Sequence, residues 1–429
     1  MKKKANVSYS KIKKNKNAST LIKNFGYLSL LQIASYLFPL ITLPYLAKVI
    51  GPIGFGKIAF ASAVITWFTS VITWGFDFTA TRDVARNREN KESVSRIFSN
   101  ILWTRVFLTV CCFPILLLLI LIIPSFRNNT SVLLVTFLLI PGHVMFPEWL
   151  FQALERMKFI TILSLLSKFF FTIAVLLFID TPDDYILQPL FTALGYIVSG
   201  IVALYLIVFK WGYKVYPPSI AIIFRTLKDG ADVFINNFMP NLYNSLSAVL
   251  LGSFYGDVAN GLLSAGTKLI NMCHQFMNVL SRVFFPFLSR KIEKHNFYAI
   301  LTLTISILFS FILFAFSPFL IRLLYSDEFN DAIIILRILS VTLIFMALSN
   351  VYGTNYLILK GYEKELRNIT FICSIIGMLI AIPIIYKYSY WGAALTVCLT
   401  RGLLAFVITI RAFKYNKSKN DKQITTSIQ

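Results

Sequence analysis

Apolar residues occur along this chain in twelve long runs, separated by shorter polar gaps. A helix needs about 20 apolar residues to cross a bilayer core of about 30 Å, and each run reaches roughly that length. The predicted spans are 24–47, 57–76, 98–123, 132–152, 159–179, 186–209, 231–252, 258–285, 298–325, 332–357, 368–387 and 391–412. The pattern predicts an all-α membrane protein with twelve transmembrane helices.

Lysine and arginine gather in alternate gaps. The N-terminal tail, the gap at 77–97, the gap at 286–297 and the C-terminal tail are basic, whereas the odd-numbered gaps hold only five of the 41 basic residues and seven of the 19 acids. Short cytoplasmic loops accumulate Lys and Arg. We therefore expect both termini to face the cytoplasm.

The composition narrows the class of protein. A hydrophobic fraction of 57% with a mean hydropathy of +0.71 excludes a soluble globular chain. The net charge of +22 is spread along one membrane face, so anionic lipids at the cytoplasmic face, and no nucleic acid, are the expected partners. The cysteines form no CxxC pair and the histidines lack metal-ligand spacing, so we expect no metal and no cofactor.

Two glycine-rich turns suggest an internal repeat. The run ending in Gly51, Pro52 and Gly56 and the run ending in Gly252 and Gly256 are each followed by a helix rich in small residues. Six spans separate them, so both copies would enter the membrane in the same direction, with a pseudo-two-fold axis along the membrane normal. The alternative is that small residues serve only helix packing.

The repeat predicts two six-helix bundles joined by a basic linker. The expected parts are a basic cytoplasmic tail at 1–23, an N-terminal bundle at 24–209, a basic cytoplasmic linker at 210–229, a C-terminal bundle at 230–412 and a second basic tail at 413–429.

Five cations lie within the predicted spans, where an ionisable group costs on the order of 3 kcal/mol and needs a partner or a function. Lys168, Lys268 and Arg401 fall near the bilayer midplane, and Arg105 and Arg337 are shallower. A water-filled cavity lined by Lys and Arg would bind an anion, with Arg suited to bidentate phosphate contacts. The shallower two could instead extend to the membrane interface.

Few acids lie near these cations in the sequence. The candidates for coupling or gating are Asp77, Glu148 and Asp232, together with Arg82, which lies five positions after Asp77. The alternative, which we favour, is that these groups cap helices or pair with neighbouring charges. No nucleotide-binding loop is present, so we do not expect this chain to hydrolyse ATP.

Four motifs resemble one known family. They are the run from Pro44 to Gly56, the segment GFDFTATR from Gly75, the segment PEWLFQALERMK from Pro147, and LSNVYG from Leu348. Together they resemble bacterial oligosaccharide flippases of the polysaccharide biosynthesis family, O-antigen type, within the multidrug/oligosaccharidyl-lipid/polysaccharide exporter superfamily. Ala153 departs from the family pattern, which usually has Gly there.

The resemblance implies a multi-pass protein of the bacterial inner membrane that is not an enzyme. It would move an undecaprenyl-pyrophosphate-linked oligosaccharide repeat unit, such as O-antigen for lipopolysaccharide, to the periplasmic leaflet by alternating access. Polysaccharide polymerase and chain-length proteins are the further partners that it implies.

Two other functions stay open. A small-molecule or drug exporter of the same superfamily should carry acidic intramembrane residues for a cationic cargo, and this chain shows the opposite sign. A membrane enzyme of polysaccharide polymerisation should carry a long outward loop with catalytic groups, and the outward gaps here are short.

Overall fold

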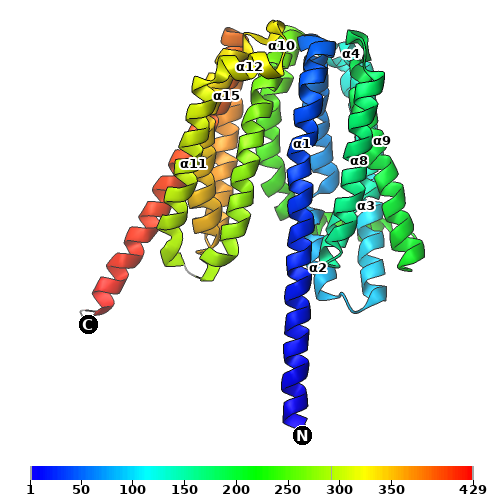
Figure 1. Cartoon of the computed structure of the whole chain (residues 1–429), viewed down its shortest axis with the longest axis vertical. Coiled ribbons are helices and arrows are strands. Elements are labelled where there is room, and N and C mark those ends of the chain that lie inside the picture. The colour runs from blue at the N-terminus through cyan, green and yellow to red at the C-terminus, as the bar shows by residue number, and fades with distance from the viewer. Residues whose placement is uncertain (1, 291, 428–429) are drawn as a thin grey trace. The chain divides into compact units, whose positions relative to one another are not determined.

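The regular structure of this protein is helical wherever the chain is described (Figure 1). The computed structural model describes residues 2–290 and 292–427. Within these ranges the side chains of 2–25, 28–29, 36, 232, 236–237, 240–244, 282–283, 286–287, 290 and 416–427 are not described. The prediction of an all-α protein is confirmed for the described residues.

Nine stretches of the described chain are long and apolar enough to cross a membrane. They are Leu30–Arg86, Lys91–Ile122, Thr130–Ala153, Met157–Phe178, Pro182–Lys210, Ser245–Ser281, Ile292–Ala315, Ala332–Ile358 and Glu363–Tyr415. Several of them confirm a multi-pass membrane protein, and each overlaps one or two of the runs predicted from the sequence.

Three long helices contain a residue with non-helical backbone angles. These helices are α1 (Lys2–Thr73), α10 (Ile220–Arg290) and α15 (Glu363–Ser427). Their exceptional residues are Gly51 at φ 59°, ψ −173°, Gly256 at φ 79°, ψ −167°, and Ser389 at φ 53°, ψ −135°. Glycine adopts positive φ without a steric penalty. All three residues lie in gaps predicted between two spans, and the count of twelve spans stays a prediction.

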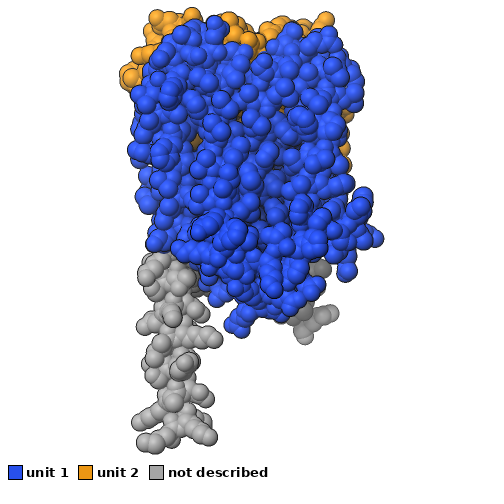
Figure 2. Space-filling view, turned by 90° about the vertical axis from the view of Figure 1, so that its right-hand side faces the viewer, with its two compact units in different colours: residues 1–46, 68–235 blue, residues 47–67, 236–429 orange. Residues whose placement is uncertain are grey.

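The chain forms two compact units (Figure 2). Unit 1 comprises residues 1–46 and 68–235, and unit 2 comprises residues 47–67 and 236–429. Residues 47–67 of α1, which fall in the predicted N-terminal bundle, are therefore part of unit 2.

Unit 1 is built from short and long helices around an aromatic core. Its elements after α1 are α2 (Phe76–Arg86), α3 (Lys91–Ile122), α4 (Pro124–Asn128), α5 (Thr130–Phe137), α6 (Leu139–Met145), α7 (Glu148–Ala153), α8 (Met157–Phe178), η1 (Pro182–Ile186), α9 (Leu187–Tyr205) and η2 (Leu206–Lys210). Phe98, Trp149 and Phe151 are almost fully buried in this core. Helices α8 and α9 run side by side (Figure 1).

The predicted span at 132–152 is divided into α5, α6 and α7. The break between α6 and α7 falls at Phe146 and Pro147, where proline has no backbone N–H for a helical hydrogen bond. A plain count of apolar residues cannot detect such a break.

The N-terminal part of the predicted linker packs against α3. The Ser95 hydroxyl accepts from the backbone N–H of Lys214 at 3.1 Å, and the Ser99 hydroxyl accepts from that of Tyr216 at 2.9 Å. The Trp103 indole donates to the Tyr216 carbonyl at 2.8 Å. Residues 212–219, which are outside regular structure, are thus fixed to unit 1.

In unit 2 the segment 47–67 crosses α10 at very close range. A Cβ added at Gly56 would lie 1.7 Å from the Asp257 carbonyl oxygen, and one added at Gly261 would lie 2.1 Å from the Pro52 carbonyl oxygen. Phe55 packs on Tyr325 and Phe329 with ring centroids 6.0 and 5.6 Å apart. Only glycine permits this approach of two backbones.

The remaining elements of unit 2 follow α10 in chain order. They are η3 (Ile292–Lys294), α11 (His295–Ala315), α12 (Ser317–Leu324), η4 (Asp327–Phe329), α13 (Ala332–Ser340), α14 (Thr342–Leu348), the π-helix η5 (Ser349–Ile358) and α15. The LSNVYG motif enters η5, where the buried Asn355 amide contacts Ser281 and Tyr298 at 2.7 and 3.0 Å.

Candidate functional site

A cavity of about 410 Å³ lies within unit 2. It is lined by residues of α1, α10, α13, α14 and α15, and both Lys268 and Arg401 belong to this lining. No aspartate or glutamate lines it among the described residues. A lining that holds two cations and no described carboxylate makes this cavity attractive to an anion.

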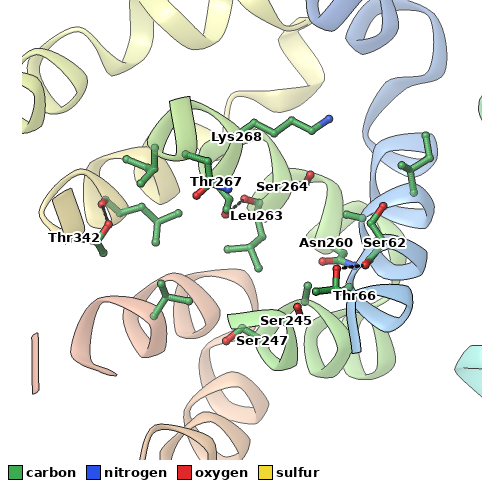
Figure 3. A pocket seen from close by; sticks show the side chains of 18 of the residues that line it. Ser62, Thr66, Ser245, Ser247, Asn260, Leu263, Ser264, Thr267, Lys268 and Thr342 are labelled. Atoms are coloured by element: carbon green, nitrogen blue, oxygen red, sulfur yellow. Dashed lines mark hydrogen bonds between the residues drawn. The ribbon is translucent and has the colours of Figure 1, made fainter. Parts of the chain in front are cut away.

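The rest of the lining is rich in hydroxyl and amide groups. On the part of α10 that follows Gly256, the polar lining residues are Asn260, Ser264, Thr267, Lys268 and Asn271, which recur at the three- and four-residue spacing of one helix face. Ser62 and Thr66 follow the same spacing on α1 and lie close to Asn260 (Figure 3). Such groups can exchange hydrogen bonds with a polar, uncharged ligand.

Lys268 extends from α10 toward α1 (Figure 3), and its Nζ lies over the Phe55 ring, 4.0 Å from the centroid. A cation over an aromatic face is stabilised by about 0.5–2 kcal/mol, and the ring leaves the remaining N–H donors of the ammonium available. Phe55 therefore holds the cation at the cavity without neutralising it.

Asn260 is fully buried at 0% exposure. Its Nδ2 donates to the Gly56 carbonyl at 3.3 Å, while its Oδ1 has no hydrogen-bond partner in the described part of the chain. A buried acceptor without a partner costs roughly 1–3 kcal/mol. A donor on a bound ligand would recover this cost.

A second cavity, of about 350 Å³, lies within unit 1 between α1, α8 and α9. Lys168 and Glu148 both line it, together with Gln188, Tyr196 and several hydroxyl groups. No ion pair within 4.0 Å joins Glu148 to Lys168 in the described structure. This cavity offers one positive and one negative side chain to a ligand.

The two shallower cations contact protein groups. Arg105 is buried at 4% exposure and donates to Asp77 at 2.7 Å. Arg337 donates from Nε to the Ser317 hydroxyl at 2.9 Å and lies 5.7 Å from the Phe314 ring centroid. Neither lines the two cavities, so Lys268 and Arg401 are the two of the five predicted cations that line one cavity together.

The predicted coupling or gating residues lie in different surroundings. Asp77 pairs with Arg105, and Arg82 pairs with Asp83 at 2.8 Å on the exposed surface of α2. Glu148 is half-buried in the unit 1 cavity. The side chain of Asp232 lies outside those described.

Sequence reasoning found the charges of these cavities and missed most of their polar lining. The missed groups are hydroxyls, which are common in membrane helices and carry no signal one at a time. Their spacing carries a signal: on α9, Gln188, Thr192, Tyr196 and Ser199 recur at intervals of four, four and three residues. A search for polar periodicity would have identified both cavity faces.

Comparison with known proteins gives concordant results. A family model described as "Polysaccharide biosynthesis protein" matches residues 21–292. A relative from Escherichia coli (strain K12) bears the name "Putative O-antigen transporter" and is 27% identical over 399 residues, which cover 91% of this chain and 96% of the relative.

The solved structures with a similar fold include two transporters. One is lipid II flippase MurJ in an inward closed conformation, with a TM-score of 0.74 at 15% identity, covering 89% of this chain and 87% of that one. The other is an inward-facing multidrug resistance MATE family transporter of the MOP superfamily, with a TM-score of 0.69 at 14% identity, covering 93% and 99%. At such identity the likeness shows that the helices are arranged as in these transporters.

Proposed function

We propose that this chain, which belongs to the polysaccharide biosynthesis protein family, moves an undecaprenyl-pyrophosphate-linked oligosaccharide across the bacterial inner membrane. The name of the Escherichia coli relative and the fold shared with a lipid flippase support this function. A glycan with a diphosphate cannot cross hydrocarbon unaided, because each unsatisfied polar group would cost several kcal/mol. The protein supplies a polar path instead, and it acts as a transporter without enzymatic activity.

The proposed architecture is two six-helix bundles that alternate access. Each of the three long stretches that contain Gly51, Gly256 and Ser389 would provide two spans. The nine stretches would then provide twelve transmembrane spans. The similar backbone angles of Gly51 and Gly256 support the internal repeat inferred from the sequence. Both termini would then face the cytoplasm, where the basic tails contact anionic lipids.

The observation that carries the proposal is the joint placement of Lys268 and Arg401 in the unit 2 cavity, whose lining has no carboxylate among the described residues. We assign the diphosphate of the substrate to these two cations, with Arg401 suited to bidentate contact. The hydroxyl and amide groups of the same lining would bind sugar hydroxyls. At another step of the transport cycle, Lys168 would bind the same diphosphate in the unit 1 cavity.

A drug exporter is the second candidate, favoured by one observation. Glu148 places a carboxylate in the unit 1 cavity, and a carboxylate suits a cationic cargo. Competition separates the two functions: a cationic dye should not displace the lipid-linked oligosaccharide from a flippase and should displace it from an exporter that shares the site.

Reconstitution into liposomes with a fluorescent polyprenyl-diphosphate oligosaccharide tests the proposal. We expect Lys268→Ala and Arg401→Ala each to lower the translocation rate roughly tenfold to a hundredfold, because hydrogen bonds to charged groups contribute about 1.5–3 kcal/mol. Lys168→Ala should lower it as well.

Arg322→Ala is the matched control, since Arg322 is an exposed cation of unit 2 that does not line the cavity. Its rate should equal that of the unaltered protein. Unchanged translocation in all three cavity variants, at preserved thermal stability, would remove the head-group role of these cations. Polymerase and chain-length proteins remain proposed partners downstream.

A further inference from the structure

An apolar groove of about 360 Å³ lies between α8 and α9 in unit 1. Of its twelve lining residues only Ser167 and Ser199 are polar. Several apolar side chains of the lining are well exposed, among them Phe170 at 63% and Val198 at 59%. The groove is therefore open toward the surroundings of the membrane helices, and no side chain of the described residues fills it.

The groove is continuous with the charged cavity of unit 1. Ser167, Phe171 and Ser199 line both of them. Lys168, which lines the polar cavity, directly follows the shared Ser167 on α8. A lipid-facing helix surface is ordinarily apolar, but it does not ordinarily lead into a cavity that contains a lysine and a glutamate.

Small residues bring α8 and α9 close together beside the groove. A Cβ added at Gly195 would lie 2.2 Å from the Ser167 Oγ, so glycine at this position leaves room for the Ser167 hydroxyl between the two helices. Gly195 itself lines the groove. The bulkier Phe170, Phe171 and Phe191 surround it and provide flat apolar walls.

We propose that the α8–α9 groove holds the polyisoprenyl tail of the lipid-linked substrate next to its diphosphate. This inference rests on the proposed function and adds a tail site to it. An amphipathic ligand fits the pair of sites: the apolar chain lies along α8 and α9, the phosphates reach Lys168, and Glu148 and Gln188 accept or donate to sugar groups in the polar cavity. The carboxylate of Glu148 lines only the polar cavity, away from the tail.

The test compares two tryptophan substitutions on α9. Val198→Trp fills the groove, whereas Ile201→Trp alters a β-branched residue of the same helix that is 56% exposed and does not line the groove. Binding and translocation are measured in liposomes for a 55-carbon substrate and for a short-tailed analogue with the same head group. A substrate carrying a photoreactive group in its tail maps the contact.

Val198→Trp should weaken binding of the 55-carbon substrate about tenfold, because it would displace about two methylene groups of the tail from the groove. The short-tailed analogue should bind equally to both variants, and the photoreactive tail should label α8 and α9 around Phe170. Ile201→Trp should behave as the unaltered protein.

Equal behaviour of Val198→Trp and Ile201→Trp with the long substrate overturns the groove assignment. Labelling by a photoreactive phospholipid that excess substrate does not reduce would likewise assign the groove to bulk lipid and overturn it. If the unaltered protein neither binds nor moves the substrate, the proposed function itself fails, and this outcome is distinct from the other two.

Discussion

At the scale of single residues, the pairing of Arg105 with Asp77 shows how a membrane helix accommodates a cation. Arg105 is 4% exposed, while the Asp77 side chain is 56% exposed. The guanidinium is thus buried and its counter-charge is accessible to water. We interpret this pair as a structural element of unit 1, because Arg105 does not line either cavity.

Asp77→Asn should destabilise unit 1, since it leaves a buried guanidinium without its counter-charge. The full cost of breaking a buried pair is about 3–5 kcal/mol, and the exposure of Asp77 reduces the expected loss to about 1–3 kcal/mol. Thermal unfolding in detergent measures it. The double variant Asp77→Asn with Arg105→Met should recover part of the loss.

The exposed pair of Arg82 and Asp83 on α2 is the control. Its side chains are 57% and 44% exposed, so Asp83→Asn should change stability by less than about 1 kcal/mol. A loss at Asp83 as large as that at Asp77 would show that general surface charge, and not the buried pair, sets the stability.

The charged residues of the membrane helices show how much of the site could be predicted from the sequence. Lys268 and Arg401 were identified because a charge within an apolar run is rare, and the structure places both in one cavity. The partner of Arg105 could not be assigned, since Asp77 is 28 positions away and belongs to a different helix. Sequence distance does not report which helix faces pack together.

At the scale of helices, the apolar runs predicted the stretches that can span a membrane, and the Gly51 and Gly256 turns lie where glycine was expected. The third reversal, at Ser389, has no glycine signal, because a serine adopts the positive φ there. The break at Pro147 and the π-helix η5 depend on local hydrogen bonds that hydropathy does not describe.

The crossing of 47–67 with α10 depends on glycine at both contact points. Gly261→Ala would place a Cβ 2.1 Å from the Pro52 carbonyl oxygen, and a backbone atom cannot move aside as a side chain does. Overpacking of this kind costs about 1–3 kcal/mol. We expect a lower unfolding temperature in detergent and slower translocation, because Asn260 directly precedes Gly261 and the cavity lining of α10 resumes at Leu263.

Gly26→Ala provides the reference for that experiment. Nothing lies within 4 Å of a Cβ at Gly26, so this variant adds the same methyl group to α1 without a clash. It should be as stable as the unaltered protein or slightly more stable, since alanine favours the helix. Equal stability of Gly261→Ala and Gly26→Ala would contradict the close crossing.

At the scale of the whole molecule, the orientation in the membrane is predicted from the distribution of charged residues between the gaps. The contacts within the fold carry no information about it. The gap around Asp183 holds Asp180, Asp183 and Asp184, whereas the gap around Glu89 holds several arginines. The excess of Lys and Arg on one side predicts that Asp183 faces the periplasm and Glu89 the cytoplasm.

Single cysteines at these positions test the orientation. Asp183 is exposed, and its neighbour Asp184 should be left intact because its carboxylate accepts from Thr181 and caps η1. A membrane-impermeant maleimide should label Asp183→Cys in intact cells and Glu89→Cys only after permeabilisation.

The protein without either change sets the background from its own five cysteines, all of which lie in predicted spans. Labelling of Glu89→Cys in intact cells would contradict the predicted orientation. The topology would then be inverted, and the side of the protein proposed to face the cytoplasm would face the periplasm.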